Sequence, residues 1–321
     1  MRQDKNGSGR LSRLGRSREI GIVAVLAAIC LVMSLMTSEF ATVGNIMNIL
    51  KQVTLVMIIA CSQTFVITSG GIDLSVGFVM GLSSIVMCKL ITFSVPVPIA
   101  VLACVLCGVC LGAVNGLLIT RLNLPPFIIT LGMQYVTRGL INVITEGYTI
   151  MIDSPFIMAI GQGKIGPVPI MVLFIPIVVG GMYFLYDKTV FGNHVKAVGG
   201  NETAAWLSGI QVNRIRIMIY ALNGLLCGLV GVIITGRLNA GNPNAGLNYD
   251  MNTIGAVIIG GTAISGGSGT VAGAALGALL LGVIRNCLTL LKVNMYWETV
   301  VTGIIIIAVC ALDSMTRKRR G

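Results

Sequence analysis

The chain has few side chains that could take part in covalent chemistry. Its single histidine, His194, has no carboxylate, cysteine or second histidine at a useful spacing, so neither metal binding nor acid–base catalysis is indicated. Cys104, Cys107 and Cys110 form a C-x2-C-x2-C run inside an apolar stretch, but the fourth cysteine of a bacterial iron–sulfur motif is missing. We interpret these cysteines as small packing residues and predict no metal site and no enzyme activity.

A glycine-rich segment from Gly261 to Ser268 has the spacing of a phosphate-binding loop, G-x4-G-K-[ST]. Gly267 stands where that loop has the lysine that reaches the β- and γ-phosphates. Without the lysine, nucleotide binding is not expected. We predict no cofactor in this chain, and if ATP drives it, a separate protein binds the ATP and Mg²⁺.

One acidic residue, Asp73, lies among apolar residues, where an ionisable group is expensive and is a candidate for function. It follows Ser69, Gly70 and Gly71, and a new apolar segment begins just after it. Because Asp is a good helix N-cap, both a capping role and a role in gating or substrate contact are open. Polar residues that could bind a hydroxylated solute, or a neighbouring helix, are Gln63, Asn115, Gln134, Asn142 and Asn223.

The elements that carry these residues are predicted to be transmembrane helices. Of the 321 residues, 55% are hydrophobic and 10% charged, whereas soluble domains carry about 25% charged residues. The sequence predicts an all-α integral membrane protein with about ten transmembrane helices. The predicted spans are residues 20–37, 52–69, 76–93, 97–119, 126–145, 169–186, 217–235, 251–264, 270–291 and 296–312. The eighth is short, which indicates a broken or re-entrant helix and leaves eight or nine crossings open.

Arg138, Arg285 and Glu298 are further ionisable residues that lie within these spans. We expect the two arginines to pair with acids or carbonyl groups and so to fix helices in place.

Basic residues indicate the orientation, because they cluster in residues 1–19, in residues 187–216 and at the C-terminal end. With ten crossings, these segments fall on one side, which the positive-inside rule makes cytoplasmic. We predict a basic tail over residues 1–19, one transmembrane domain over 20–313 with a cytoplasmic segment at 187–216, and a basic tail over 314–321. The net charge of +11 then indicates contact with anionic lipid, and no nucleic-acid binding is expected.

Residues 265–281 repeat residues 69–85 at a coarse level, with a serine and four glycines at one constant spacing. Glycine-interrupted apolar segments at matching positions of two halves point to a transport pathway. We predict two related halves, parallel or inverted. The residues expected to flank the pathway are Gly70, Gly71, Asp73, Ser75, Gly77, Ser265, Gly266, Gly267 and Gly269.

Glycines also recur every four residues at Gly108, Gly112 and Gly116 and at Gly224 and Gly228. Small-residue faces of this kind let helices approach closely in lipid. The close contact could form within the chain or between two copies of it.

The longest connection between apolar spans contains a short segment with helix-capping signals. Asn201 is a good N-cap and Gly209 a good C-terminal stop. Trp206 and Leu207 would be exposed on this helix unless a partner covers them, so we expect a docking helix for a cytoplasmic protein.

Together these motifs resemble the permeases of bacterial monosaccharide importers of the ATP-binding-cassette type, closest to the ribose type. The similarity is carried by residues 68–77, 199–210 and 260–269. Ala204, Ala205 and Gly209 match the A-A-x3-G pattern by which importer permeases engage their ATPases. One departure is that Thr203 separates Glu202 from the alanine pair, which leaves the role of Glu202 open.

The resemblance implies the type II importer permease fold in the bacterial inner membrane. It also implies a second permease copy, identical or related, an ATPase, and a periplasmic sugar-binding protein. The residues it assigns to coupling are Gly199, Gly200, Asn201, Glu202, Ala204, Ala205, Ser208, Gly209 and Ile210.

The expected function is import of a monosaccharide such as ribose, and an ion-coupled secondary transporter of a small polar solute is the alternative. The acidic residues expected at the periplasmic face, as solvated loop charges or as partners of the binding protein, are Glu39, Glu146, Asp153 and Asp250.

Overall fold

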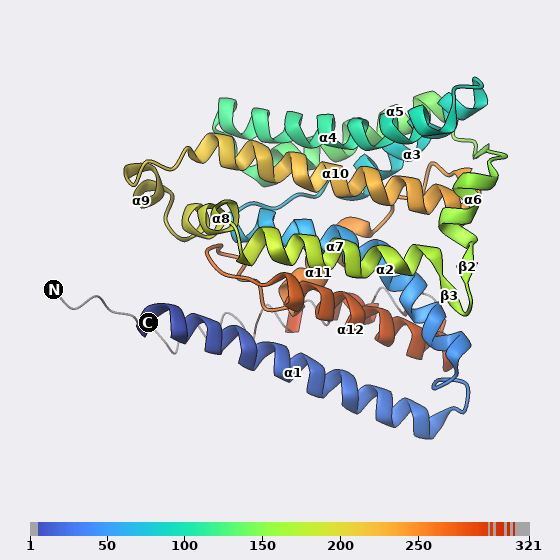
Figure 1. Ribbon diagram of the computed structural model, residues 1–321, viewed down its shortest axis with the longest axis horizontal. Helices are drawn as coiled ribbons and strands as arrows, with labels where there is room; N and C mark the ends of the chain where they lie inside the picture. Colours follow the sequence, from blue (N-terminus) through green and yellow to red (C-terminus); the bar gives the residue numbers. More distant parts are fainter. Residues whose placement is uncertain (1–5, 295, 298–299, 305–306, 309–310, 312–321) are drawn as a thin grey trace.

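The computed structural model describes residues 6–294, 296–297, 300–304, 307–308 and 311. In this part of the chain, long helices run side by side along one common direction (Figure 1). The first elements are α1 (Asn6–Met36), α2 (Val43–Thr68), α3 (Val76–Thr92), α4 (Val97–Leu122), α5 (Pro126–Thr145), β1 (Ile150–Met151), α6 (Pro155–Gln162), β2 (Lys164–Ile165) and β3 (Val168–Pro169). The later elements are α7 (Ile170–Asp187), α8 (Val190–Gly200), α9 (Glu202–Leu207), α10 (Val212–Leu238), β4 (Ala240–Gly241), α11 (Tyr249–Ile259) and α12 (Val271–Leu290).

Within the described residues, seven helices are long and apolar enough to cross a membrane, and α3 is a shorter apolar helix. The seven are α1 from Glu19 onward, α2, α4, α5, α7, α10 and α12. The eighth predicted span, residues 251–264, contains only the short helix α11, as its length indicated. The tenth predicted span, residues 296–312, is described only in part, and Glu298 lies outside the described residues.

Three long helices begin well before the apolar runs predicted, α1 at Asn6, α2 at Val43 and α10 at Val212. The first turns of α2 and α10 include polar residues, among them Asn45 and Arg214, and so fall outside the apolar runs. In α2 the polar groups are satisfied across the bundle, because the side-chain amides of Asn45 and Asn286 bond each other reciprocally, at 3.0 and 2.8 Å. A helix can therefore continue past the apolar run where such a partner exists.

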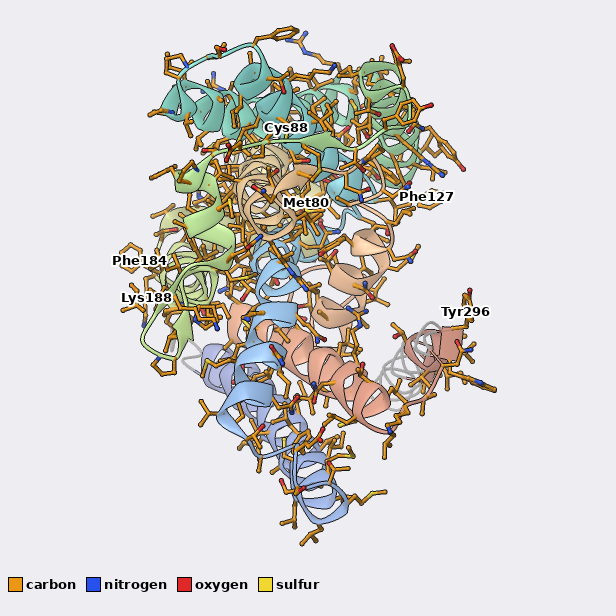
Figure 2. All side chains as sticks on the ribbon, turned by 90° about the vertical axis from the view of Figure 1, so that its right-hand side faces the viewer. Met80, Cys88, Phe127, Phe184, Lys188 and Tyr296 are labelled. Carbon is orange, nitrogen blue, oxygen red and sulfur yellow. The ribbon has the colours of Figure 1, made fainter. Side chains whose placement is uncertain are left out.

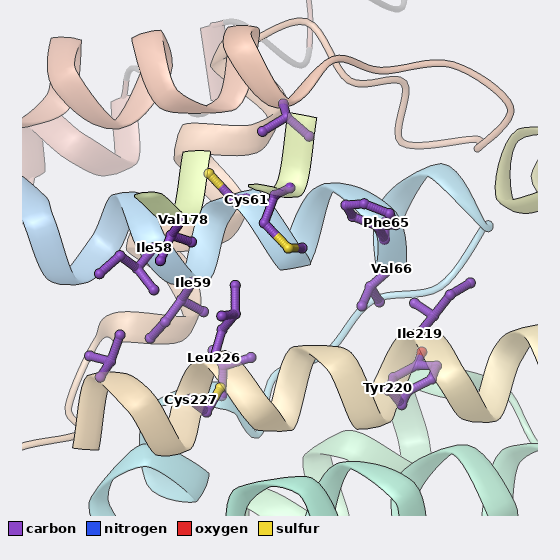
Figure 3. Close-up of a cluster of buried hydrophobic side chains, with 14 of the residues drawn as sticks. Ile58, Ile59, Cys61, Phe65, Val66, Val178, Ile219, Tyr220, Leu226 and Cys227 are labelled. Atoms are coloured by element: carbon purple, nitrogen blue, oxygen red, sulfur yellow. The ribbon is translucent and has the colours of Figure 1, made fainter. Parts of the chain in front are cut away.

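The core forms around α2 and α10, which lie at the centre of the bundle. Of the most apolar 18-residue stretch of α2, 83% is buried inside the protein, against 6% of the corresponding stretch of α1. Phe65 and Val66 of α2 lie across from Ile219 and Tyr220 of α10 (Figure 3). The outer helices keep apolar side chains on the surface, including Phe127 on α5 (Figure 2). This is the pattern expected when lipid replaces water around the outer helices.

The glycine repeats of α4 and α10 are used inside the chain. A methyl group added at Gly112 would overlap the carbonyl of Tyr220 and lie 3.1 Å from the Cα of Gly224. A methyl group at Gly108 would likewise overlap the carbonyl of Gly224. The two backbones are therefore in direct contact, and these glycines form an intramolecular face.

We expect Gly112→Leu to prevent the close packing of α4 against α10, because there is no space for the leucine side chain between the two backbones. Overpacking a tight core costs about 1–3 kcal/mol or more, so the amount of folded protein recovered from membranes should fall several-fold. Gly181→Leu on α7 is the matched control, since a Cβ there meets nothing within 4 Å. Size-exclusion chromatography of detergent-solubilised protein measures both. Equal recovery of the two variants would contradict the close packing.

Two short ladders close the end of the bundle opposite α9. β1 pairs antiparallel with β4, with Ile150 opposite Gly241, and β2 pairs antiparallel with β3, with Lys164 opposite Pro169. The first ladder ties the connection after α5 to the end of α10. These strands are the one departure from the predicted all-α content.

Candidate functional site

The first glycine break carries Asp73 into the interior of the bundle. The chain leaves α2 after Thr68, turns at Gly70 with φ +83°, and runs back along α2. The backbone carbonyl of Asp73 then accepts a hydrogen bond from Nε2 of Gln63, at 3.0 Å. Because Gln63 lies more than one turn before the end of α2, α3 begins inside the bundle.

The carboxylate of Asp73 is the centre of a buried hydrogen-bond network. Its Oδ1 accepts from the backbone N–H of Ser75 at 2.9 Å and from the hydroxyl of Ser75 at 2.6 Å. Its Oδ2 accepts from Nδ2 of Asn223 at 2.9 Å. Asn223 also donates to Oε1 of Gln63 at 3.0 Å, and Asn115 donates to the hydroxyl of Ser75 at 2.9 Å. We call these five residues, Gln63, Asp73, Ser75, Asn115 and Asn223, the Asp73 network.

The Asp73 network joins four helices, because its members come from α2, α4, α10 and the start of α3. All five side chains are buried. One carboxylate oxygen of Asp73 binds Ser75, the N-cap residue of α3, and the other binds Asn223 of α10. Gln63 and Asn115 were predicted as substrate contacts. In this conformation both side chains are fully buried and form hydrogen bonds with other members of the network.

A second re-entrant segment meets the first. After β4 the chain turns back into the bundle, and a methyl group added at Gly246 would overlap the backbone of Gly77 in the first turn of α3. α11 therefore also begins inside the bundle, so the N-termini of two short helices lie close together. Asp250, in the first turn of α11, is buried and accepts from Nε2 of Gln134 at 3.3 Å. Asp250 is therefore not the solvated loop charge that the sequence suggested.

The sequence interpretation missed residues 242–248 as a structural element. The segment is rich in Asn, Pro and Gly, and Asn244 and Asn248 are exposed on it. Non-helical backbone at membrane depth is tolerated where protein covers it or where it lines a water-filled cavity. The run of asparagines in an otherwise apolar region was the available signal.

The register of the sequence repeat differs from the register of the structure. α2 ends in a turn at Gly70, and α11 ends in the same kind of turn at Gly261, with φ +83° and +89°. In both turns the N–H of the next residue bonds the carbonyl five residues earlier. Gly266 and Gly267, which the sequence aligns with Gly70 and Gly71, form a separate turn. The second break is longer, so the aligned glycines are not structural counterparts.

Three glycine segments far apart in sequence meet at one end of the bundle. The N–H of Gly267 donates to the carbonyl of Thr68 at 2.8 Å. A methyl group at Gly199 would overlap that carbonyl, and one at Gly266 would lie 2.8 Å from the oxygen of Gly199 and 3.1 Å from the Cα of Gly70. We call Thr68, Gly70, Gly199, Gly266 and Gly267 the glycine junction. It places Gly199, at the end of α8, in backbone contact with both breaks.

The short capped helix predicted in the cytoplasmic segment is present as α9. The side chain of Asn201 accepts from the N–H of Ala204 at 2.9 Å, and Gly209 ends the helix with φ +84°. Trp206 and Leu207 are 66% and 74% exposed. An open pocket of about 560 Å³ lies beside them. Its lining residues are Glu202, Thr203, Trp206, Gln211, Val212, Asn213 and Arg214.

Glu202, whose role the sequence left open, fixes α9 to α10. Its two carboxylate oxygens accept from the two terminal nitrogens of Arg216, at 2.8 and 2.6 Å. Bidentate geometry of this kind sets an orientation as well as a distance. The longest connection also contains a second helix, α8, which the sequence interpretation missed.

Residues 45–310 match the sequence profile of the permease component of branched-chain amino acid transport systems. The chain belongs to this permease family. A ribose import permease of Bacillus subtilis is 40% identical over 93% of the chain and 94% of its own length. An L-arabinose permease of Azospirillum brasilense is 35% identical, over 94% and 88%, and a D-allose permease of Escherichia coli is 36% identical, over 93% and 92%. No solved structure shows a significant match.

As a member of this family, the permease is a membrane transport subunit and not an enzyme. Its remaining candidate residues have structural partners. Arg138 places its guanidinium over the ring of Phe78, 5.5 Å from the centroid, and Arg285 donates to the amide oxygen of Asn252 at 3.4 Å. Of the cysteine run, Cys104 is buried against α10, whereas Cys110 is exposed. The predicted packing role therefore holds for Cys104 and is wrong for Cys110.

Proposed function

We propose that the permease is the membrane-spanning subunit of an ATP-driven importer of a monosaccharide such as ribose. The observation that carries this proposal is the similarity, over nearly the full length of both chains, to permeases named for ribose, L-arabinose and D-allose. A separate ATPase would bind ATP and Mg²⁺, and a periplasmic binding protein would deliver the sugar.

α9 is the proposed docking site for the ATPase. Its exposed Trp206 and Leu207 lie next to the pocket beside α10, which offers apolar surface together with charged groups. A buried apolar anchor with a polar rim is the usual anatomy of a protein interface. The side of the bundle that carries α8, α9 and the N-terminal end of α1 (Figure 1) would then face the cytoplasm, with both termini inside.

We expect Leu207→Asp to abolish co-purification with the ATPase while the permease still inserts into the membrane. The substitution puts a charge at the centre of an apolar contact, and losing such an anchor costs about 2 kcal/mol or more. Val190→Asp on α8 is the matched control, because Val190 is also exposed. An affinity pull-down from solubilised membranes measures the effect. Normal ATPase recovery with Leu207→Asp would place the docking site elsewhere.

A second permease copy is proposed to cover the exposed face of α5. On that face Arg138 is exposed, and a Cβ at Gly132 or Gly139 would meet nothing within 4 Å. A charged side chain facing lipid is costly, and glycines on a helix surface suit close approach by another helix. The copy could be identical or a related permease.

The proposed sugar path runs where α5 meets the start of α11. Two short helices that begin inside a bundle are a recurring arrangement at transporter substrate sites. Gln134 and Asp250 supply an amide and a carboxylate at that place, and Asn248 is exposed beside them. The breaks at 69–75 and 260–270 would be equivalent parts of two parallel halves, with the Asp73 network as a gate. Glu39, Glu146 and Asp153, which are exposed, could meet the binding protein.

The function is tested by reconstituting the permease in liposomes with its ATPase, its binding protein and ATP. Uptake of radiolabelled ribose, arabinose and allose is compared with uptake of leucine. ATP-dependent sugar uptake supports the proposal, whereas leucine uptake would favour the substrate in the family's description. Sugar uptake by the permease alone under an ion gradient would establish a secondary transporter instead.

A further inference from the structure

Tyr186 is a buried tyrosine that connects the cytoplasmic segment to the first break. It lies in the last turn of α7 and is one of the largest fully buried side chains. Its hydroxyl lies 2.9 Å from Oγ1 of Thr68, and either atom can donate. Because Thr68 is the last residue of α2 and belongs to the glycine junction, Tyr186 reaches the junction directly.

Thr68 has contacts on three sides. Its backbone carbonyl accepts from Gly267, and its side chain bonds Tyr186. A methyl group added at Gly269 would lie 2.9 Å from Oγ1 of Thr68. The Thr68 side chain therefore lies between Tyr186 and the second break. A displacement of Tyr186 would move Thr68 and so affect both breaks.

α8 holds Tyr186 from the other side. Nζ of Lys196 lies 4.2 Å above the Tyr186 ring and 2.9 Å from Oδ1 of Asp187. Phe65 of α2 packs edge-on against the same ring at 4.9 Å and stacks on Phe191 of α8 at 6.0 Å. The ring thus lies between α2 and α8, with its hydroxyl as the polar link.

We propose that Tyr186 is a positioning residue that couples movement of α8 and α9 to movement of the breaks, through the hydrogen bond between its hydroxyl and that of Thr68. The inference rests on the proposed function, in which an ATPase moves the α8–α9 segment. The ring contacts alone would fill the space between α2 and α8. The buried hydroxyl adds a directional link, and a hydroxyl buried without a partner is unfavourable.

The test uses Tyr186→Phe in the complete importer, reconstituted with ATPase and binding protein. This variant keeps the ring and its contacts with Lys196 and Phe65 and removes only the hydroxyl. We expect normal folding, normal ATPase binding and unchanged basal ATP hydrolysis. The number of sugars imported per ATP, and the stimulation of hydrolysis by the loaded binding protein, should fall roughly five-fold, as for the loss of one hydrogen bond.

Three companion variants separate coupling from simple stability. Tyr183→Phe, on the same helix and 43% exposed, should behave as wild type. Thr68→Ser keeps the hydroxyl and should keep coupling, whereas Thr68→Val should match Tyr186→Phe. The Tyr186→Phe/Thr68→Val double variant should be no worse than either single variant, since both remove the same bond.

A normal ratio of sugar to ATP in Tyr186→Phe overturns the role of Tyr186. The proposal is also overturned if basal ATP hydrolysis and the amount of protein recovered fall as much as the ratio of sugar to ATP, because Tyr186 would then have only a structural role. Failure of the wild-type importer to take up any sugar overturns the proposed function itself, so the two failures are distinguishable.

Discussion

Gly199→Ala is expected to reduce sugar uptake at least ten-fold although it adds only one methyl group. The added Cβ would overlap the carbonyl of Thr68 and lie 2.8 Å from the nitrogen of Gly267. These are backbone atoms, so no flexible side chain can move aside, and overpacking of this kind costs about 1–3 kcal/mol. The glycine junction must then separate, which disconnects the α8–α9 segment from both breaks.

The neighbouring glycine provides a control at the same place. A Cβ at Gly200 meets nothing within 4 Å, so Gly200→Ala should transport as wild type. ATP-dependent uptake into proteoliposomes is measured for both variants, together with ATPase recovery in a pull-down. The ATPase should still bind Gly199→Ala, because α9 and its exposed Trp206 and Leu207 are unchanged. Equal uptake by the two alanine variants would show that the junction is not part of the coupling route.

Asp73→Asn is expected to lower both uptake and thermal stability. The asparagine can keep one oxygen toward Ser75, where the carboxylate accepts two hydrogen bonds. Its amide nitrogen then faces Nδ2 of Asn223, which at present donates to Asp73. Two donors face each other in a buried site, and an unsatisfied buried group costs about 1–3 kcal/mol. The contact between the first break and α10 is thereby lost.

Ser75→Ala distinguishes the two functions of the carboxylate. It removes the hydroxyl that bonds Oδ1 and accepts from Asn115, but it keeps the backbone N–H bond and leaves Oδ2 on Asn223. We expect a smaller loss of uptake for Ser75→Ala than for Asp73→Asn. Uptake assays and thermal melts of purified protein measure both variants. If Asp73→Asn transports normally, Asp73 is only a helix cap and the Asp73 network is not a gate.

Composition and motif spacing predicted much of the local structure correctly. The apolar runs identified most of the long helices, because hydropathy over a helix length is a strong signal in lipid. The capped helix at α9 followed from Asn201 and Gly209, since capping depends on neighbouring residues only. The glycine faces of α4 and α10 also followed, although spacing could not tell an internal contact from a contact between copies.

What the sequence could not predict were relations between distant segments. Gly70, Gly199 and Gly266 were singled out separately, and only the fold shows that they touch. The structural register of the two breaks was not predictable, because loop length can change while a serine and several glycines still align. The burial of Asp250 was not predicted, because residues 242–248 carry no apolar run to mark their return into the bundle. Tyr186 gave no signal at all, since a buried hydroxyl is recognised by its partner, Thr68.

The glycine junction and the α9 surface differ in their sensitivity to ionic strength. The Glu202–Arg216 pair is partly exposed, and dissolved salt screens such charges. The junction consists of uncharged backbone groups and the buried side chain of Thr68, so neither counterions nor protons have a charge to act on there. Raised ionic strength is therefore expected to weaken the contact between α9 and α10 without acting on the glycine junction.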